Sequence, residues 1–172
     1  PLVGALSRAG SGWVSDRWGG ARVTFWVFVL MMLGVFGVMY FIQAASWWGF
    51  LGAFIFMFFM TGVGNASTFQ MIPNIMRQEV PRLMPELAPD AALRQAEKES
   101  AAIVGFTSAI AAYGAFFIPK SFGSAIAATG SPMAALWGFF ILYASCAALT
   151  WFLYTRRSGL LPDIERGRTP AP

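Results

Sequence analysis

Arg8 is the residue in this chain whose chemistry stands out, because it lies inside an apolar stretch about two helical turns before Asp16. The residues on its helical face are small or weakly polar: Gly4, Ser11, Gly12 and Ser15. An arginine at the centre of a bilayer costs roughly 2.5–3.5 kcal/mol on insertion scales, so it needs an anionic partner. That partner is either an acid on a neighbouring helix or an oxyanion that matches the paired N–H donors of a guanidinium.

Polar side chains also occur in the segment that follows the apolar run of residues 50–60. The segment 61–73 has the apolar character of a membrane helix but also holds four polar side chains: Asn65, Ser67, Thr68 and Gln70. Polar groups at membrane depth are costly unless they face protein or a water-filled path, so we expect this segment to line a path. Hydrogen bonding between helices, worth about 1 kcal/mol per residue, explains Asn65 and Gln70 equally well.

Residues 12–22 form a charged turn of the pattern G-x-x-x-D-R-x-G-G-x-R, which contains Gly12, Asp16, Arg17 and Gly19. The glycines permit a tight reversal and close contact between helices. Asp16 is placed to accept N–H groups at the N-terminus of another helix, and Arg17 is placed to hold the turn at a membrane surface. An ordinary charged loop is the simpler alternative.

The composition indicates that these residues are carried by an all-α membrane protein. Hydrophobic residues make up 57% of the 172 residues and charged residues 12%, about half the charge of a soluble domain. We predict one partial span at about residues 1–15 and four full spans near the ~20 residues that a bilayer requires. The full spans are residues 23–43, 47–76, 101–119 and 133–154. The second of these is long, which predicts tilt or a break near Pro73.

The links between the predicted spans differ in character. Residues 44–46 are small and uncharged, which predicts a helical hairpin. Residues 77–100 are expected to be the one soluble segment, with a short amphipathic surface helix at 91–100 that has Asp90 as its N-cap. Residues 121–132 read as a loop. Residues 1–158 then form a partial transmembrane bundle, and residues 159–172 a cytoplasmic tail that we expect to be disordered.

The distribution of charge predicts the orientation. Ten of the twelve Lys and Arg residues fall in the links on one side or in the tail, and the opposite side holds Lys120. Because Lys and Arg collect on the cytoplasmic side, the C-terminus is predicted to be cytoplasmic, and nucleic acid is not an expected partner. The sequence contains no His and one Cys, and it shows no nucleophile–base pair or phosphate loop. We therefore predict no enzyme, no metal and no cofactor.

The charged turn resembles the loop signature of the major facilitator superfamily, which follows the second helix and is often repeated after the eighth. If this is the later copy, the spans correspond to helices 8–12 of the C-terminal bundle. Residues 62–73, GVGNASTFQMIP, then resemble the corresponding stretch of the nitrate/nitrite porter family. Residues 105–119, GFTSAIAAYGAFFIP, resemble the second nitrate signature of that family, with Ala111 and Ala115 where glycine is expected. The resemblance extends over essentially the whole chain except the tail.

The resemblance implies roles for individual residues. Arg8 matches one of two substrate-binding arginines, and the other belongs to the N-terminal half, which we expect to be missing because the chain begins mid-helix without Met. Four further residues match positions near the substrate path: Asn65, Ser108, Gln70 and Tyr113. Four glycines match helix-packing positions: Gly62, Gly64, Gly105 and Gly114. The gating loop comprises Gly12, Asp16, Arg17 and Gly19.

The function implied is secondary transport of nitrate and/or nitrite across the cell inner (cytoplasmic) membrane by alternating access, as nitrate/nitrite antiport or nitrate/proton symport. The expected partners are the nitrate or nitrite anion, the lipid bilayer and the missing N-terminal half. No predicted span contains an acid, which favours exchange. A major facilitator carrier for another small anion and a non-transporting membrane scaffold or receptor are the alternatives.

Overall fold

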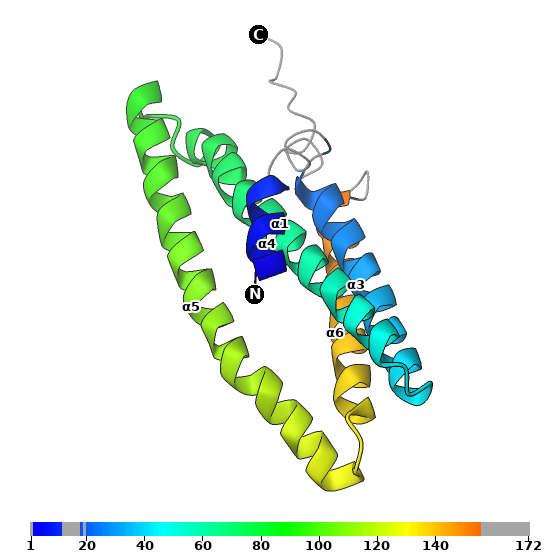
Figure 1. Cartoon of the computed structure of the whole chain (residues 1–172). Coiled ribbons are helices and arrows are strands. Elements are labelled where there is room, and N and C mark those ends of the chain that lie inside the picture. The colour runs from blue at the N-terminus through cyan, green and yellow to red at the C-terminus, as the bar shows by residue number, and fades with distance from the viewer. Residues whose placement is uncertain (1, 12–17, 19, 156–172) are drawn as a thin grey trace.

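A computed structural model describes residues 2–11, 18 and 20–155, and this part of the chain is helical (Figure 1). The helices are α1 (Leu2–Gly10), α3 (Gly20–Gln43), α4 (Trp47–Leu83), α5 (Pro89–Thr129) and α6 (Met133–Thr150), which continues into the π-helical turn η1 (Trp151–Thr155). Four described segments are long and apolar enough to cross a membrane: Gly20–Gln43, Trp47–Leu83, Pro89–Thr129 and Met133–Tyr154. The predicted all-α membrane fold is confirmed. The predicted boundary between residues 158 and 159 lies outside the described residues.

The predicted hairpin of the second and third spans is formed by α3 and α4. The chain reverses at Ala45, whose φ of 49° is in the left-handed region that non-glycine residues seldom adopt. Ser46 then caps α4, because its hydroxyl accepts a hydrogen bond from the Gly49 N–H at 3.4 Å. The two helices pack along their length through α3 residues such as Val27 and Met31.

Helix α3 is the centre of the core, because it packs against α4 on one side and α6 on the other. Val35 and Val38 are almost fully buried and form a cluster with Leu136 of α6. Towards the start of α3, Val23 and Val27 pack with methionine and valine side chains of α4. Through this packing α3, α4 and α6 form one unit, with α1 against α4 and α5 in contact with α4 and α6 (Figure 1).

Of the two predictions for this long span, a break near Pro73 was wrong, because α4 continues through both Pro73 and Pro81 to Leu83, and tilt stays a prediction. A proline removes one backbone hydrogen bond, and in membrane helices neighbouring groups compensate for that loss. At 1.5 Å per residue, the 37 residues of α4 extend roughly 55 Å, well beyond the ~30 Å hydrocarbon core.

Helix α5 corrects three predictions, since one helix of 41 residues replaces the surface helix, the span and most of the loop. Residues 90–104 contain no Gly or Pro, so the helix continues from the predicted surface helix into the predicted span. Toward its C-terminal end it includes both Pro119 and Gly123. It stops only at Gly130, which has a φ of 70°. Asp90 is not the N-cap: Ala88 holds that position, and Asp90 lies in the first turn, where its charge complements the helix dipole.

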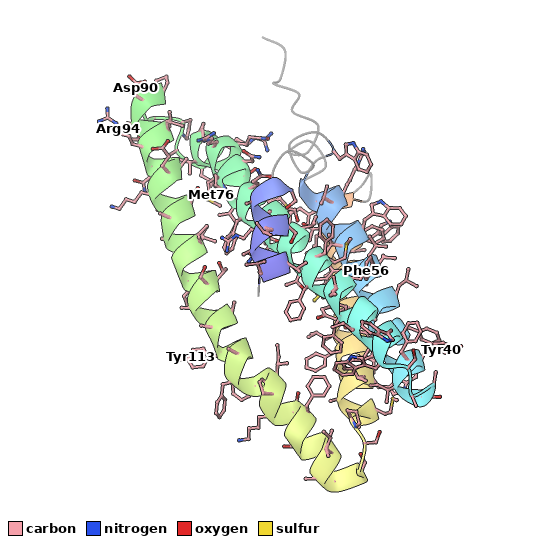
Figure 2. The ribbon with its side chains drawn as sticks, in the orientation of Figure 1. Tyr40, Phe56, Met76, Asp90, Arg94 and Tyr113 are labelled. Atoms are coloured by element: carbon pink, nitrogen blue, oxygen red, sulfur yellow. The ribbon has the colours of Figure 1, made fainter. Side chains whose placement is uncertain are left out.

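The predicted soluble segment 77–100 is therefore mostly helical, and only residues 84–88 separate α4 from α5. Asp90 and Arg94 lie at the start of α5, at the end of the molecule where α4 turns into α5 (Figure 2). Val80 of α4 packs there against Ala92 and Ala96 of α5. At the opposite end, α5 meets α6 through the stacked rings of Phe122 and Phe139, 5.4 Å apart. Between these two contacts the middle of α5 is exposed.

Candidate functional site

Helix α1 is held against α4 at Gly62. A Cβ atom on residue 62 would overlap the Ser7 hydroxyl oxygen and the Gly4 carbonyl oxygen, so the two helices approach as closely as their backbones permit. Ser7 is itself buried and donates a hydrogen bond of 3.1 Å to the Gly4 carbonyl. The contact fixes the position of α1 along α4, and therefore that of Arg8, the residue after Ser7.

The Arg8 guanidinium lies over an aromatic ring of α4. Its Cζ atom is 5.0 Å from the centroid of the Phe69 ring, within the range of a cation–π interaction. Among the described residues, no carboxylate forms an ion pair with Arg8, and no hydrogen bond to its guanidinium is present. The N–H donors of this cation therefore remain available within the described part of the chain.

Arg8 lines an open cavity of about 590 Å³ between the helices, and the Arg8 side chain is exposed. Side chains from α1, α3, α4, α5 and α6 contribute to its wall, including Thr24 and Phe28 of α3 and Tyr143 of α6. Arg8 is the one charged residue among the described residues that line this cavity, and no Asp or Glu is found there. The described wall of the cavity therefore carries a single positive charge.

Besides Arg8, Thr24 and Tyr143, the cavity wall has five further polar residues: Thr61, Asn65, Thr68, Thr107 and Ser108. The three threonine hydroxyls already donate to carbonyls of their own helices, at 2.8 to 2.9 Å from their closest acceptors. Within the described residues, the side chains of Asn65 and Ser108 make no hydrogen bond, so both retain a free donor. Arg8, Asn65 and Ser108 thus bring uncommitted N–H and O–H groups to one cavity, from three different helices.

Two residues that the family resemblance placed near the path lie elsewhere. Tyr113 is 68% exposed and projects away from the other helices (Figure 2). Gln70 is partly buried and does not line the cavity; its Oε1 atom is buried without a hydrogen-bond partner in the described part of the chain. A direct role of either residue in binding substrate stays a prediction.

The predicted packing glycines fall into two groups. Gly62 contacts α1 as described, and a Cβ atom on Gly64 would lie 2.9 Å from Val27 Cγ1 of α3. A Cβ atom added to Gly105 would have no neighbour within 4 Å, and one added to Gly114 would meet only Ile118 of its own helix. Close packing therefore involves the α4 glycines, whereas a packing role for the two α5 glycines stays a prediction.

Ser67 shows that not every polar residue of α4 faces the cavity. Its side chain is fully buried between α3 and α4, where its hydroxyl and that of Thr24 share a hydrogen bond of 2.8 Å. Phe69 and Tyr143 were not singled out from the sequence. The one available signal was that Phe69 lies a helical turn after Asn65, on the face that also carries Thr61. The gating-loop residues are outside the described residues: Gly12, Asp16, Arg17 and Gly19.

The fold and the cavity define the chain as a multi-pass, all-helical membrane protein with a cationic cavity between its helices. No family model matches the sequence. The nitrate/nitrite transporter NarU of Salmonella typhimurium is 42% identical over 165 residues, covering 91% of this chain and 35% of that protein. NarU of Escherichia coli is 40% identical over 164 residues, with the same coverage of 91% and 35%.

The probable nitrate/nitrite antiporter NarK2 of Thermus thermophilus is 32% identical over 165 residues, covering 94% of this chain and 33% of that protein. The chain thus spans about a third of the length of these curated relatives. The resemblance to nitrate/nitrite porters that the sequence motifs indicated is confirmed. All three relatives are named as transporters or antiporters and none as an enzyme.

Proposed function

We propose that this chain is part of a secondary transporter that carries nitrate and/or nitrite across the cytoplasmic membrane, and that Arg8 binds the anion. The observation that carries the proposal is the guanidinium of Arg8, which faces a cavity without acidic residues and has unpaired donors among the described residues. A planar guanidinium binds a planar oxyanion through two parallel N–H···O bonds. The names of the three relatives support nitrate or nitrite as that anion.

Asn65 and Ser108 complete the proposed set of donors on this side of the site. Nitrate has three oxygen atoms, so an anion bound through two of them at Arg8 presents a third to other donors. The Asn65 amide and the Ser108 hydroxyl line the same cavity and carry donors that no described residue occupies. They also come from α4 and α5, so an anion that bridges them would draw two helices toward α1.

The proposed mechanism is alternating access, in which helices move about a central site so that it opens to one side at a time. Tight backbone contacts such as that of Gly62 with α1 allow helices to move as units. Nitrate/nitrite exchange is the proposed form of coupling, because no Asp or Glu lines the cavity within the described residues. An acid there would be the natural carrier for a coupled proton.

The orientation that we propose places the C-terminal end on the cytoplasmic side. The helical segments on either side of the α4–α5 turn carry four basic residues: Arg77 and Arg82 near the end of α4, and Arg94 and Lys98 near the start of α5. The opposite end carries Lys120 among the described residues. Such an asymmetry is typical of the positive-inside distribution.

The test is anion uptake by proteoliposomes that contain the complete protein of which this chain forms a part. Arg8→Lys keeps the charge but removes the planar pair of donors, so we expect the KM for nitrate to rise at least tenfold. The matched control is Arg94→Lys, an exposed arginine at the start of α5 that donates to the Asp90 carbonyl. A normal KM for Arg8→Lys would refute the proposed anion site.

Transport of a different small anion is the second candidate, because a cavity of about 590 Å³ is larger than a four-atom anion requires. Competition separates the two: excess nitrate or nitrite should suppress uptake of labelled nitrate, whereas small carboxylates and phosphate should not. Suppression by a carboxylate at lower concentration than nitrate would favour the second candidate.

A further inference from the structure

The ring of Phe69 on α4 contacts the guanidinium of Arg8 on α1 through a cation–π interaction that joins the two helices. We propose that Phe69 is a positioning residue, which holds the guanidinium of Arg8 at the cavity so that its N–H groups remain free for the anion. The inference rests on the proposed function of Arg8 and adds Phe69 as the residue that positions the Arg8 guanidinium for that function.

The chemistry of the ring explains why it suits this task better than an acid. An aromatic face attracts a cation through its quadrupole and uses none of the five N–H donors of the guanidinium. A carboxylate in the same place would occupy those donors and neutralise the charge. The described residues provide the ring and no carboxylate, so the interaction leaves the N–H donors of Arg8 unoccupied.

The backbone geometry supports the same conclusion. Gly62 and Phe69 are seven residues apart on α4, which places them two turns apart on one face of the helix. Gly62 fixes the backbone of α1 through its contact with Ser7, and Phe69 holds the end of the next side chain. Arg8 is therefore held at both its backbone and its guanidinium by one face of α4. Asn65, one turn from Phe69 on the same face, lines the same cavity.

Nitrate uptake by the complete protein in proteoliposomes tests the proposal. Cation–π energies at accessible sites predict that Phe69→Leu raises the KM for nitrate about two- to fivefold, with kcat changed less than twofold. Phe69→Tyr keeps the ring face and should retain a KM near that of the wild type. Phe59→Leu is the matched control, since Phe59 lies on α4, is 45% exposed and does not line the cavity.

Fluorinated phenylalanines at position 69 keep the shape of the ring while they weaken the attraction of its face for a cation. The KM should rise stepwise from phenylalanine to trifluorophenylalanine if the ring acts through its face. This arm also covers the case in which Phe69→Leu fails to fold. An unchanged KM across the fluorinated series would overturn the proposal and leave only a space-filling role for the ring.

A double-mutant comparison separates this proposal from the function on which it rests. When Arg8→Lys has already raised the KM, adding Phe69→Leu should raise it less than in the wild type, because the two residues act together. Equal effects of Phe69→Leu in both backgrounds would refute the positioning role and leave the anion site standing. A normal KM for Arg8→Lys would instead refute the anion site itself.

Discussion

Ser7 of α1 and Gly62 of α4 are in contact where the two helices cross, and the contact leaves no room for a Cβ atom on residue 62. Arg8 follows Ser7, so its position in the cavity depends on the absence of a side chain at residue 62. Residue 62 lies two turns before Phe69, whose ring contacts the Arg8 guanidinium. The helix crossing and the cavity that Arg8 lines are therefore connected through α1, and a change at the crossing should also alter the cavity.

Gly62→Ala should destabilise the protein, because the added methyl group overlaps the Ser7 hydroxyl and the Gly4 carbonyl. Overpacking of this kind costs about 1–3 kcal/mol, and displacement of α1 should also raise the KM for nitrate. Unfolding of the complete protein in detergent measures the first effect, and vesicle uptake measures the second.

The control for this change is Gly52→Ala on the same helix, where no atom lies within 4 Å of the added Cβ position. It should leave the free energy of unfolding unchanged or raise it by up to about 1 kcal/mol, because alanine is the better helix former. If Gly62→Ala were as stable as Gly52→Ala, the close crossing of α1 and α4 would be contradicted.

The hydrogen bond of 2.8 Å between Thr24 and Ser67 should contribute modestly to the attachment of α3 to α4. Thr24→Val and Ser67→Ala, combined in a double-mutant cycle, are expected to give a coupling energy of about 0.6 kcal/mol and no more than about 1.7 kcal/mol. The coupling is small because each hydroxyl has one proton, for which a carbonyl of its own helix competes: that of Gly20 for Thr24 and that of Gly64 for Ser67. Additive effects of the two substitutions on unfolding would show that the hydrogen bond is absent.

Asn65→Leu and Ser108→Ala should each raise the KM for nitrate, because each removes an uncommitted donor from the cavity. Hydrogen bonds to a charged group are worth about 1.5–3 kcal/mol, which corresponds to an increase of about ten- to a hundredfold. Thr68→Val is the control, since the Thr68 hydroxyl lines the same cavity but donates to the Gly64 carbonyl at 2.9 Å. A larger rise for Thr68→Val than for Asn65→Leu in uptake assays would reverse our assignment of the donors.

Gln70→Met should leave the stability unchanged or increase it. The Oε1 atom of Gln70 is buried without a partner among the described residues, and such an unsatisfied group costs about 1–3 kcal/mol. Unfolding of the complete protein in detergent measures the change, and nitrate uptake is measured in parallel. A raised KM together with unchanged stability would show that Gln70 binds the anion, as the family resemblance implies.

The parts of the fold that depend on hydropathy were predictable from the sequence. The hairpin at residues 44–46 and the start of α6 at Met133 follow from apolar runs separated by short turns. The continuity of α5 was not, because Pro119 and Gly123 are signals that end helices in water. Pro119 removes one backbone hydrogen bond and Gly123 removes none, and within a long helix neither loss is enough to end it.

Part of the candidate site was predictable, because polar residues within apolar helices indicate a site at membrane depth. Arg8, Asn65 and Ser108 do meet in one cavity. The direction of the remaining polar side chains was not predictable, because helical spacing gives their relative angles but not the face that meets a neighbour. Ser67 faces α3 and Tyr113 projects outward for this reason. Phe69 was overlooked because a phenylalanine in an apolar helix carries no polar signal.

The unbroken helix α5 connects one end of the molecule to the cavity that Arg8 lines. At 1.5 Å per residue, its 41 residues make a rod of roughly 60 Å, which carries Thr107 and Ser108 near its middle and Asp90 and Arg94 at one tip. A rod without an interruption between these points acts as a lever. We therefore expect that a molecule bound at Asp90 and Arg94, such as an antibody fragment, would tilt the part of the cavity wall formed by Thr107 and Ser108 without contacting it.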